Sequence, residues 1–342
     1  MKSFKSYLRP STETLLRQGK DMSIIQRKSA SLKQLFQRKG QCLKLVCPMN
    51  TLHARILEEL GYETFYVGAA AVLAPILGRL DNGTITLTES VQVSKWFADA
   101  VQMPIITDTD SCFGGIFQVE RAVKEFIQAG VAGITIEDQP FLGKRMGAVQ
   151  GKEVIPLKEA VAKYRVAADV RDEFDPDFQL IARCDALTAV NARGLPEVIE
   201  RLLAYKEAGA DILYMEGPRT LDELHEVRNA VEGPLMCTAY NLPREITDKE
   251  GAELGLSAVF YLQTLRSHTQ FMWSLYSRIQ EKGYEAIDEF SAKCPVDEEI
   301  LTRIRNKYTL GDLKSFEGKY LGSEEMKKYD LDGDHSLPRT LW

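Results

Sequence analysis

The stretch TDTDSCFGG, residues 107–115, places two aspartates two positions apart, directly after an apolar run at 104–106. Side chains alternate along a strand, so Asp108 and Asp110 would project from one face at its end. Two like charges held side by side are costly unless a cation neutralises them, which points to a metal site. Aspartate, serine and glycine are also typical turn residues, so a solvated turn is the alternative. The stretch alone leaves both interpretations open.

Short apolar, β-branched runs bounded by turn residues recur along the chain, and each is typical of a buried strand. Segments with helical periodicity separate them. The expected strands lie at 44–49, 64–69, 104–110, 133–138, 179–186, 212–217, 234–239 and 258–263. Apolar residues recur about every four positions in the segments between them, as in Leu52, Ile56 and Leu60, in Val119, Val123 and Ile127, and in Val198, Leu202 and Tyr205.

Alternating buried strands and amphipathic helices predict a parallel sheet covered by helices, which is the α/β class. Eight such units favour a closed (β/α)8 barrel of the TIM type. An open doubly wound sheet is the competing architecture, but no GxGxxG follows the first strand.

In a barrel of this kind, catalytic groups gather at the mouth formed by the C-terminal ends of the strands. The expected strand ends carry mainly acids with one arginine among them: residues 68–70, Asp108, Asp110, Glu137, Asp138, Arg183, Asp185, Glu216 and Thr238. Acids in so regular a position favour the metal interpretation of Asp108 and Asp110. Carboxylates without a histidine or cysteine cluster select a hard cation, so we expect Mg2+, with Mn2+ as an alternative.

Composition narrows the class of protein further. The chain has 342 residues, 44% of them hydrophobic, and a net charge of −6, which argues against nucleic acid as a partner. No window is apolar for long enough to span a membrane. The six cysteines show no CxxC or metal-finger spacing, which suits a reducing compartment, so we expect a cytoplasmic protein.

The two ends of the chain differ from its middle. The first 45 residues carry eleven Lys and Arg against Glu13 and Asp21 alone, which indicates an organelle transit peptide or a basic helix packed on the barrel. The helix is favoured because no cleavage pattern is evident. We therefore divide the chain into a basic extension at 1–25, the barrel at 26–285, and a helical segment with an acidic tail at 286–342.

Six motifs resemble those of the isocitrate lyase/phosphoenolpyruvate mutase superfamily in order and spacing. They are YVGAAAVLAPILGRLDNGTITL (66–87), TDTDSCFGG (107–115), ITIEDQ (134–139), KRMGAVQGKEVIP (144–156), IARCDAL (181–187) and ADILYMEG (210–217). The resemblance covers roughly residues 25 to 285. The chain is also similar in size to the smaller members, among them methylisocitrate and dimethylmalate lyases, oxaloacetate decarboxylase and phosphonopyruvate hydrolase.

The resemblance implies a Mg2+ ion surrounded by Asp81, Asp108, Asp110 and Glu137, with Asp108 as the direct ligand and the others bound partly through water. It implies that Arg183 pairs with a substrate carboxylate and that the backbone of Gly68 and Ala69 receives a substrate oxygen. Glu216 and Thr238, at two further strand ends, are assigned to the same substrate pocket.

The loop after the fourth strand departs from the lyases. They carry Lys-Lys/Arg-Cys-Gly-His there, with the cysteine as acid/base, whereas residues 144–148 of this chain read KRMGA. The thioether of Met146 cannot move a proton, and Ala148 replaces the histidine. Tyr66 and Lys144 are the candidate proton donors in its place. The alternatives are that Tyr66 fills the barrel and that Lys144 is an exposed loop lysine.

Other departures affect the substrate. Gly68 stands where the superfamily has serine, Thr238 stands where it has asparagine on the seventh strand, and the Lys-x-Asn-Ser loop of the phosphonate branch is absent. Three glycines, at 143, 147 and 151, make the loop at 140–154 flexible enough to act as a lid.

The resemblance and the departures together favour a Mg2+-dependent lyase of the carbon–carbon type. Its expected substrate is a small 2-oxo or 2-hydroxy di- or tricarboxylate, which reacts through a metal-bound enolate by C–C cleavage or decarboxylation. A C–P hydrolase or mutase of the phosphonopyruvate type and a non-catalytic dicarboxylate-binding barrel are the alternatives. The apolar stripe in residues 266–283 and the family resemblance predict a homotetramer with C-terminal helices swapped between subunits.

Overall fold

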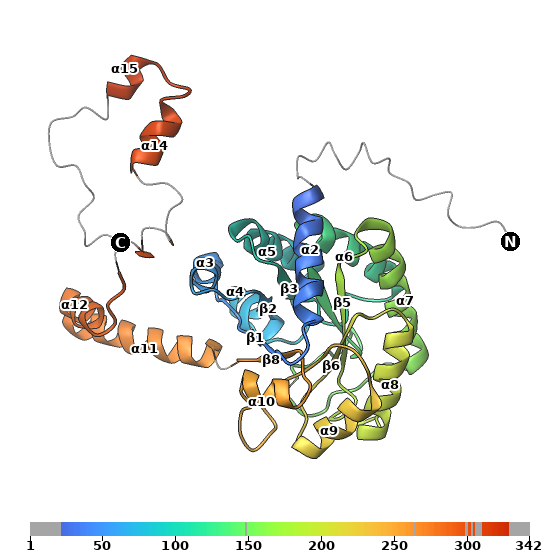
Figure 1. The fold of residues 1–342 in the computed structure, drawn as a ribbon. Helices are drawn as coiled ribbons and strands as arrows, with labels where there is room; N and C mark the ends of the chain where they lie inside the picture. The colour runs from blue at the N-terminus through green and yellow to red at the C-terminus, as the bar shows by residue number, and fades with distance from the viewer. Residues whose placement is uncertain are drawn as a thin grey trace. The chain divides into compact units, whose positions relative to one another are not determined.

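Eight parallel strands stand side by side in the order β1-β8-β7-β6-β5-β4-β3-β2. They lie at the centre of the ring of helices in Figure 1. The structure, a computed structural model, describes residues 22–147, 149–262, 264–297, 300–301, 304 and 310–327. The first and last strands of this order are joined where the Tyr66 amide donates to the Val46 carbonyl at 3.0 Å. The predicted (β/α)8 barrel is therefore confirmed. The strands are β1 (Leu43–Leu45), β2 (Phe65–Val67), β3 (Ile105–Asp108), β4 (Gly133–Glu137), β5 (Gln179–Cys184), β6 (Ile212–Met215), β7 (Leu235–Cys237) and β8 (Ala258–Phe260).

Helices follow the strands along the chain and surround the barrel (Figure 1). In α6, the predicted stripe of Val119, Val123 and Ile127 is buried against the sheet. This helix ends at Gly130, whose φ of 83° is a left-handed conformation that favours glycine. The helices after β1 to β7 are α3 (Thr51–Glu59), α4 (Ala74–Ile76), α5 (Leu87–Ala100), α6 (Ile116–Ala129), α7 (Leu157–Phe174), α8 (Leu195–Glu207), α9 (Leu221–Ala230) and α10 (Asp248–Glu253).

The stripe predicted for α3 is wrong. Leu52 and Leu60 are 42% and 69% exposed, and the buried residue of this helix is Ala54. The face of α3 that meets the core carries Ala54 and the partly buried Leu57, three residues apart, so the four-residue pattern selected a neighbouring face of the helix. Ala54 is fully buried there, and Leu57 packs against the core beside it.

The basic N-terminal stretch forms a helix on the barrel from Met22 onward. In α2 (Met22–Phe36), Leu32 and Phe36 are buried, and Leu32 lies against Gly133 at the start of β4. Lys28 donates to the carbonyls of Ala98 and Val101, at 2.7 and 2.8 Å, at the C-terminal end of α5. A cation is favourable there because the helix dipole is negative at that end.

The barrel core contains four of the chain's free cysteines, Cys47, Cys112, Cys184 and Cys237. Every strand residue except Lys44 is buried, including Cys184 and Cys237, which pack as small apolar groups as predicted. Within the described residues, no helix combines the length and the apolar character needed to cross a bilayer.

The chain divides into two compact units, 1–274 and 275–342. The helix after β8, α11 (Thr264–Lys282), has no buried residue, and the later helices are α12 (Tyr284–Lys293), α14 (Leu310–Glu317) and α15 (Ser323–Met326). The acidic tail and most of the predicted 1–25 extension lie outside the described residues. The predicted boundaries at 25 and 285 stay predictions.

Candidate active site

Charged side chains from four neighbouring strands meet at the mouth of the barrel. Asp108 and Glu137 end β3 and β4, Arg183 lies near the end of β5, and Glu216 directly follows β6; each is at most 6% exposed. Ion pairs and close charges connect them into a cluster of six carboxylates and three basic groups: Asp81, Asp108, Asp110, Glu137, Asp185, Glu216, Lys144, Lys152 and Arg183. A buried excess of negative charge is costly, and a bound cation relieves it.

Lys144 links two of the predicted metal ligands. Its ammonium pairs with Asp81 and also with Asp110, where Nζ lies 2.6 Å from Oδ1. Lys144 is 4% exposed, so the alternative of an exposed loop lysine is wrong. Burial opposes the charge on Lys144, but Glu137, Asp110 and the other acids outweigh it and raise the pKa of the ammonium above its ordinary value. Lys144 therefore stays protonated at neutral pH, and its role as a proton donor stays a prediction.

Asp108 and Glu137 are less completely satisfied. Asp108 accepts the Asp110 amide at 3.1 Å and the Ala69 amide at 3.4 Å. Neither carboxylate oxygen of Glu137 has a hydrogen-bond partner within the described residues, although Nη2 of Arg183 lies 3.4 Å from Oε2. Burial raises the pKa of both carboxyl groups despite the opposing charges of Arg183 and Lys144.

These residues fit a hydrated divalent cation better than one ligated by protein alone. Among the described residues, no three Asp, Glu, His or Cys side chains are grouped so that they could hold an ion together. Lys144 accounts for part of this, because it pairs with Asp81 and Asp110. Mg2+ commonly keeps several waters and uses one or two carboxylates, so one direct ligand suffices. The unsatisfied oxygens of Glu137 support the predicted set of Asp81, Asp108, Asp110 and Glu137.

Asp185 fixes the orientation of Arg183. Nε and Nη2 of Arg183 donate to the two oxygens of Asp185, each at 2.9 Å, and Nη2 lies 3.6 Å from Glu216. The fully buried Lys152 donates to the same Asp185 at 2.7 Å. Although burial disfavours its charge, Arg183 and Lys152 lower the pKa of Asp185 to about 2. The predicted contact between Arg183 and a substrate carboxylate stays a prediction.

The carboxylate of Glu216 accepts hydrogen bonds from three hydroxyl groups. Tyr214 and Thr238 donate to Oε2 at 2.7 and 2.8 Å, and Tyr240 donates to Oε1 at 2.5 Å. The Thr238 hydroxyl also accepts the amide of Gly217 at 3.0 Å. Thr238 thus positions Glu216 from the end of β7, and direct substrate contacts of either residue stay predictions.

The backbone after β2 forms a π-helix at Ala69–Leu73, a conformation that is often found at functional sites. Its first amide, that of Ala69, faces Asp108. A Cβ added at Gly68 would lie 3.4 Å from the sulfur of Cys47. The Cβ of the expected serine would also lie 3.3 Å from the Tyr66 ring, so it would contact both side chains. Substrate binding by Gly68 and Ala69 stays a prediction.

Tyr66 has the contacts of a barrel-filling residue. Its ring packs edge-on against Phe260, with 4.8 Å between the ring centroids, and the residue is 4% exposed. Burial, with the nearby charge of Asp108, raises the pKa of Tyr66 well above its ordinary value. These contacts favour the structural alternative, and proton donation by Tyr66 stays a prediction.

The loop at 140–154 closes over this cluster. A Cβ added at Gly147 would lie 2.0 Å from Oε1 of Glu216 and 3.0 Å from Nη2 of Arg183, so glycine is needed for this approach. Near the start of the loop, the Gln139 side chain exchanges two hydrogen bonds with the Arg145 backbone, both at 3.0 Å. At its end, Asn191 does the same with Val154, both at 2.9 Å. Ala148 lies outside the described residues.

The stretch TDTDSCFGG, residues 107–115, forms a strained turn whose two aspartates are buried. Asp108 and Asp110 are 6% and 5% exposed, so the solvated turn is wrong. Asp110, Cys112 and Phe113 adopt φ values of 50°, 61° and 60°, a region that side chains rarely enter. Such strain persists where the surroundings enforce it, and it is concentrated at functional sites. Below the turn, Lys163 donates to the carbonyl of Ser111 at 3.1 Å.

Sequence reasoning missed Lys152 as a member of the cluster, and it missed Tyr214 and Tyr240 as donors to Glu216. Tyr214 lies two residues before Glu216 on a strand, so the two-residue period could have found it. Lys152 and Tyr240 lie in irregular loops, where no period indicates the direction of a side chain.

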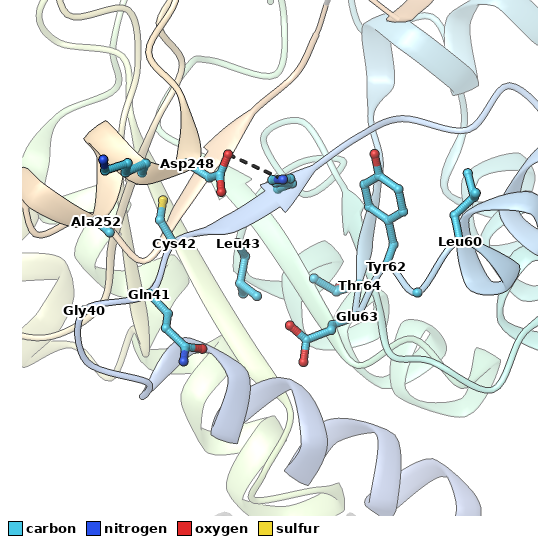
Figure 2. A pocket seen from close by; sticks show the side chains of 13 residues that line it. Gly40, Gln41, Cys42, Leu43, Leu60, Tyr62, Glu63, Thr64, Asp248 and Ala252 are labelled. Carbon is cyan, nitrogen blue, oxygen red and sulfur yellow. Dashed lines mark ion pairs between the residues drawn. The ribbon is translucent and has the colours of Figure 1, made fainter.

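A separate pocket of about 550 Å3 lies at the opposite end of the barrel, where β1 and β2 begin (Figure 2). Gln41, Cys42 and Tyr62 line it, and Asp248 of α10 forms an ion pair with Lys44 at 3.6 Å on its wall. It contains none of the cluster residues.

A sequence profile of phosphoenolpyruvate phosphomutase matches residues 32–274. The chain belongs to this family. It is 32% identical to the 2-methylisocitrate lyase of Escherichia coli (strain K12) over 245 residues, which cover 70% of this chain and 81% of that protein. It is 37% identical to the 2,3-dimethylmalate lyase of Eubacterium barkeri over 184 residues, which cover 54% of this chain and 62% of that protein.

The family's solved structures share the fold. A phosphonopyruvate hydrolase in complex with oxalate and Mg2+ matches with a TM-score of 0.72 at 25% identity, covering 86% of this chain and 99% of that one. Membership of the superfamily is therefore confirmed. The prediction of an enzyme of the lyase class is confirmed as well, since both of the relatives described above are lyases.

Proposed function

We propose that this chain is a Mg2+-dependent carbon–carbon lyase that acts on a small 2-oxo or 2-hydroxy di- or tricarboxylate through an enolate. The observation that carries the proposal is the buried cluster at the mouth, in which six carboxylates face three basic groups beneath a closed lid. The lyase relatives and the oxalate and Mg2+ in a related structure support the same chemistry.

Asp108 would hold Mg2+ directly, and Asp81, Asp110 and Glu137 would do so partly through water; Mn2+ is an alternative ion. When bound, the ion supplies positive charge that stabilises an enolate oxygen. Arg183, pre-oriented by Asp185, would pair with a substrate carboxylate. The backbone amides of Gly68 and Ala69 would donate hydrogen bonds to a second substrate oxygen.

The lid would exclude water from the enolate. Gly147 already contacts the cluster at Glu216 and Arg183, and Lys144 ties the lid to Asp81 and Asp110. Exclusion of water strengthens electrostatic interactions in the site and prevents unwanted protonation.

A C–P hydrolase of the phosphonopyruvate type is the second candidate, because a phosphonopyruvate hydrolase shares the fold over most of both chains. The absence of the Lys-x-Asn-Ser loop weighs against it. Release of inorganic phosphate from phosphonopyruvate would favour this candidate over the lyase.

A turnover panel tests the proposal. We expect the purified protein with Mg2+ to act on at least one of 2,3-dimethylmalate, 2-methylisocitrate and oxaloacetate, and to lose this activity in EDTA. Products would be followed as 2-oxo acids. Turnover that persists in EDTA, or no turnover of any of the three with Mg2+, would contradict it.

We also propose a homotetramer in which C-terminal helices are exchanged between subunits. The exposed aromatic residues of α11 support it, since Phe271 and Trp273 are 42% and 76% exposed. We further propose a cytoplasmic location, which the free cysteines support.

A further inference from the structure

The hydroxyl group of Tyr240 lies beneath the lid, beside the two charged residues that the lid covers. Tyr240 donates to Oε1 of Glu216 at 2.5 Å, and Nη2 of Arg183 lies 3.6 Å from the same oxygen. The backbone of Gly147 reaches this oxygen from above, because a Cβ there would lie 2.0 Å from it. Phenol, carboxylate, guanidinium and lid thus meet at one place.

Tyr240 differs from the other two donors to Glu216. Tyr214 and Thr238 are 2% exposed and bind the other oxygen, Oε2, whereas Tyr240 is only partly buried. Gly217 makes room for the phenol, since a Cβ at this position would lie 3.2 Å from the Tyr240 hydroxyl. Tyr240 is therefore the donor of this group that binds the same oxygen of Glu216 as the lid approaches.

We propose that Tyr240 is a catalytic residue that takes the hydroxyl proton from a 2-hydroxy acid substrate while it passes its own proton to Glu216. This inference rests on the proposed lyase function and narrows its substrate to 2-hydroxy acids. Cleavage of such a substrate needs a base for its hydroxyl, because the oxygen must become a carbonyl as the C–C bond breaks.

The step is balanced without a further reactant. The substrate O–H bond breaks as a new O–H bond forms on Tyr240, and the original phenol O–H bond breaks as Oε1 of Glu216 is protonated. The electron pair left on the substrate oxygen forms the carbonyl of a 2-oxo acid. The electrons of the C–C bond leave with the second product as its enolate. Glu216 releases its proton to water, and the enolate takes one up, when the lid opens.

The local charges suit this direction of transfer. Burial and the charge of Glu216 raise the pKa of Tyr240 above its ordinary value, so the phenol carries a proton at neutral pH. The protonated phenol can act as a base only if it gives up its own proton as it accepts the substrate proton. Oε1 of Glu216 lies within hydrogen-bond distance and would accept that proton. A base in this position typically contributes a factor of 10²–10⁴ in rate.

Two matched substitutions test the role of Tyr240. Tyr240→Phe removes the proposed relay, and Tyr214→Phe removes a hydroxyl from the same carboxylate at its other oxygen, deep in the barrel. Each protein is assayed with Mg2+ on 2,3-dimethylmalate and 2-methylisocitrate, which have a 2-hydroxyl, and on oxaloacetate, whose decarboxylation needs no hydroxyl proton removed. Affinity for oxalate with Mg2+ serves as a reference that involves no turnover.

We expect Tyr240→Phe to lower kcat for the 2-hydroxy acid by at least 100-fold, with KM, oxalate affinity and decarboxylation of oxaloacetate changed less than threefold. Tyr214→Phe should change all of these readouts by a similar factor. Equal losses in Tyr240→Phe on all readouts, or no loss on any, would overturn the proposal. Wild-type protein that only decarboxylates oxaloacetate would overturn it too, yet leave the lyase function standing. Wild-type protein inactive on every substrate would refute the lyase function itself.

Discussion

Asp110 is a residue whose charge the fold disfavours when no divalent cation is bound. Burial, reinforced by Asp108 and Asp81 and opposed by Lys144, raises the pKa of Asp110 to about 6. The folded protein therefore binds this proton more tightly than the unfolded chain does. The contribution of Asp110 to the free energy of unfolding of the metal-free protein should therefore rise as the pH falls from 7 toward 4, through the interval between its folded and unfolded pKa values.

Asp110→Asn resembles the protonated side chain, so it should raise the free energy of unfolding at pH 7 by about 3 kcal/mol in EDTA. The free energy of unfolding of this variant should also depend less on pH between 7 and 4 than that of the wild type. Urea unfolding at several pH values measures both effects. Glu207→Gln, on the exposed face of α8, removes one negative charge outside the mouth and is the matched control. Equal stabilisation by both substitutions would mean that overall charge, not the mouth, is responsible.

Individual site residues differed in how far the sequence could predict them. Asp108, Glu137, Arg183 and Glu216 lie at or next to the ends of apolar strands. Strand ends must meet at the mouth of a barrel, so the pattern located these residues. What each touches could not be predicted, because Asp185 and Lys152 decide how Arg183 is held. Tyr240 follows β7 in an irregular segment with no period that would reveal its direction.

At the level of elements, the lid depends on a glycine at its point of closest approach. Gly147→Ala would place a Cβ 2.0 Å from Oε1 of Glu216, so the loop could not close in its present position. We expect about a 100-fold loss of kcat/KM, as for other small displacements of catalytic geometry. Cleavage by trypsin after Lys144 and Arg145 should become several-fold faster.

Gly143→Ala is the matched control within the same loop. A Cβ there meets nothing within 4 Å, although the φ of 87° makes alanine mildly strained. It should therefore retain most activity and protection from trypsin. If Gly143→Ala and Gly147→Ala behave alike, loop backbone strain, and not the contact with Glu216, limits closure.

The strands and most of the helical stripes were predictable because burial imposes a period on the residues that face the core. The stripes of α6 and α8 are confirmed, since Val119, Val123, Val198 and Leu202 are all buried. The prediction for α3 was wrong because Ala54 and Leu57, which lie three residues apart, form its contact with the core. The π-helix after β2 has no periodic signature in a run of alanines.

At the scale of the whole molecule, the exposed aromatic side chains of α11 lead to a prediction about assembly. The helix has no buried residue, and Trp273 is 76% exposed. We expect a mass of four chains by light scattering at micromolar concentration. Trp273→Ala should shift the protein toward smaller species, because it removes apolar contact area. A wild-type monomer would contradict the prediction. From the sequence, the tetramer was expected on the apolar stripe of residues 266–283 and on the family resemblance.

The central claim is that the acidic cluster at the mouth binds a divalent cation together with an oxocarboxylate. Calorimetric titration of Mg2+ into the protein in the presence of oxalate tests it most directly. We predict one Mg2+ per wild-type chain, and at least 100-fold weaker binding in Asp108→Ala with an unchanged circular dichroism spectrum. Equal affinity for Mg2+ and oxalate in wild type and Asp108→Ala would contradict the account.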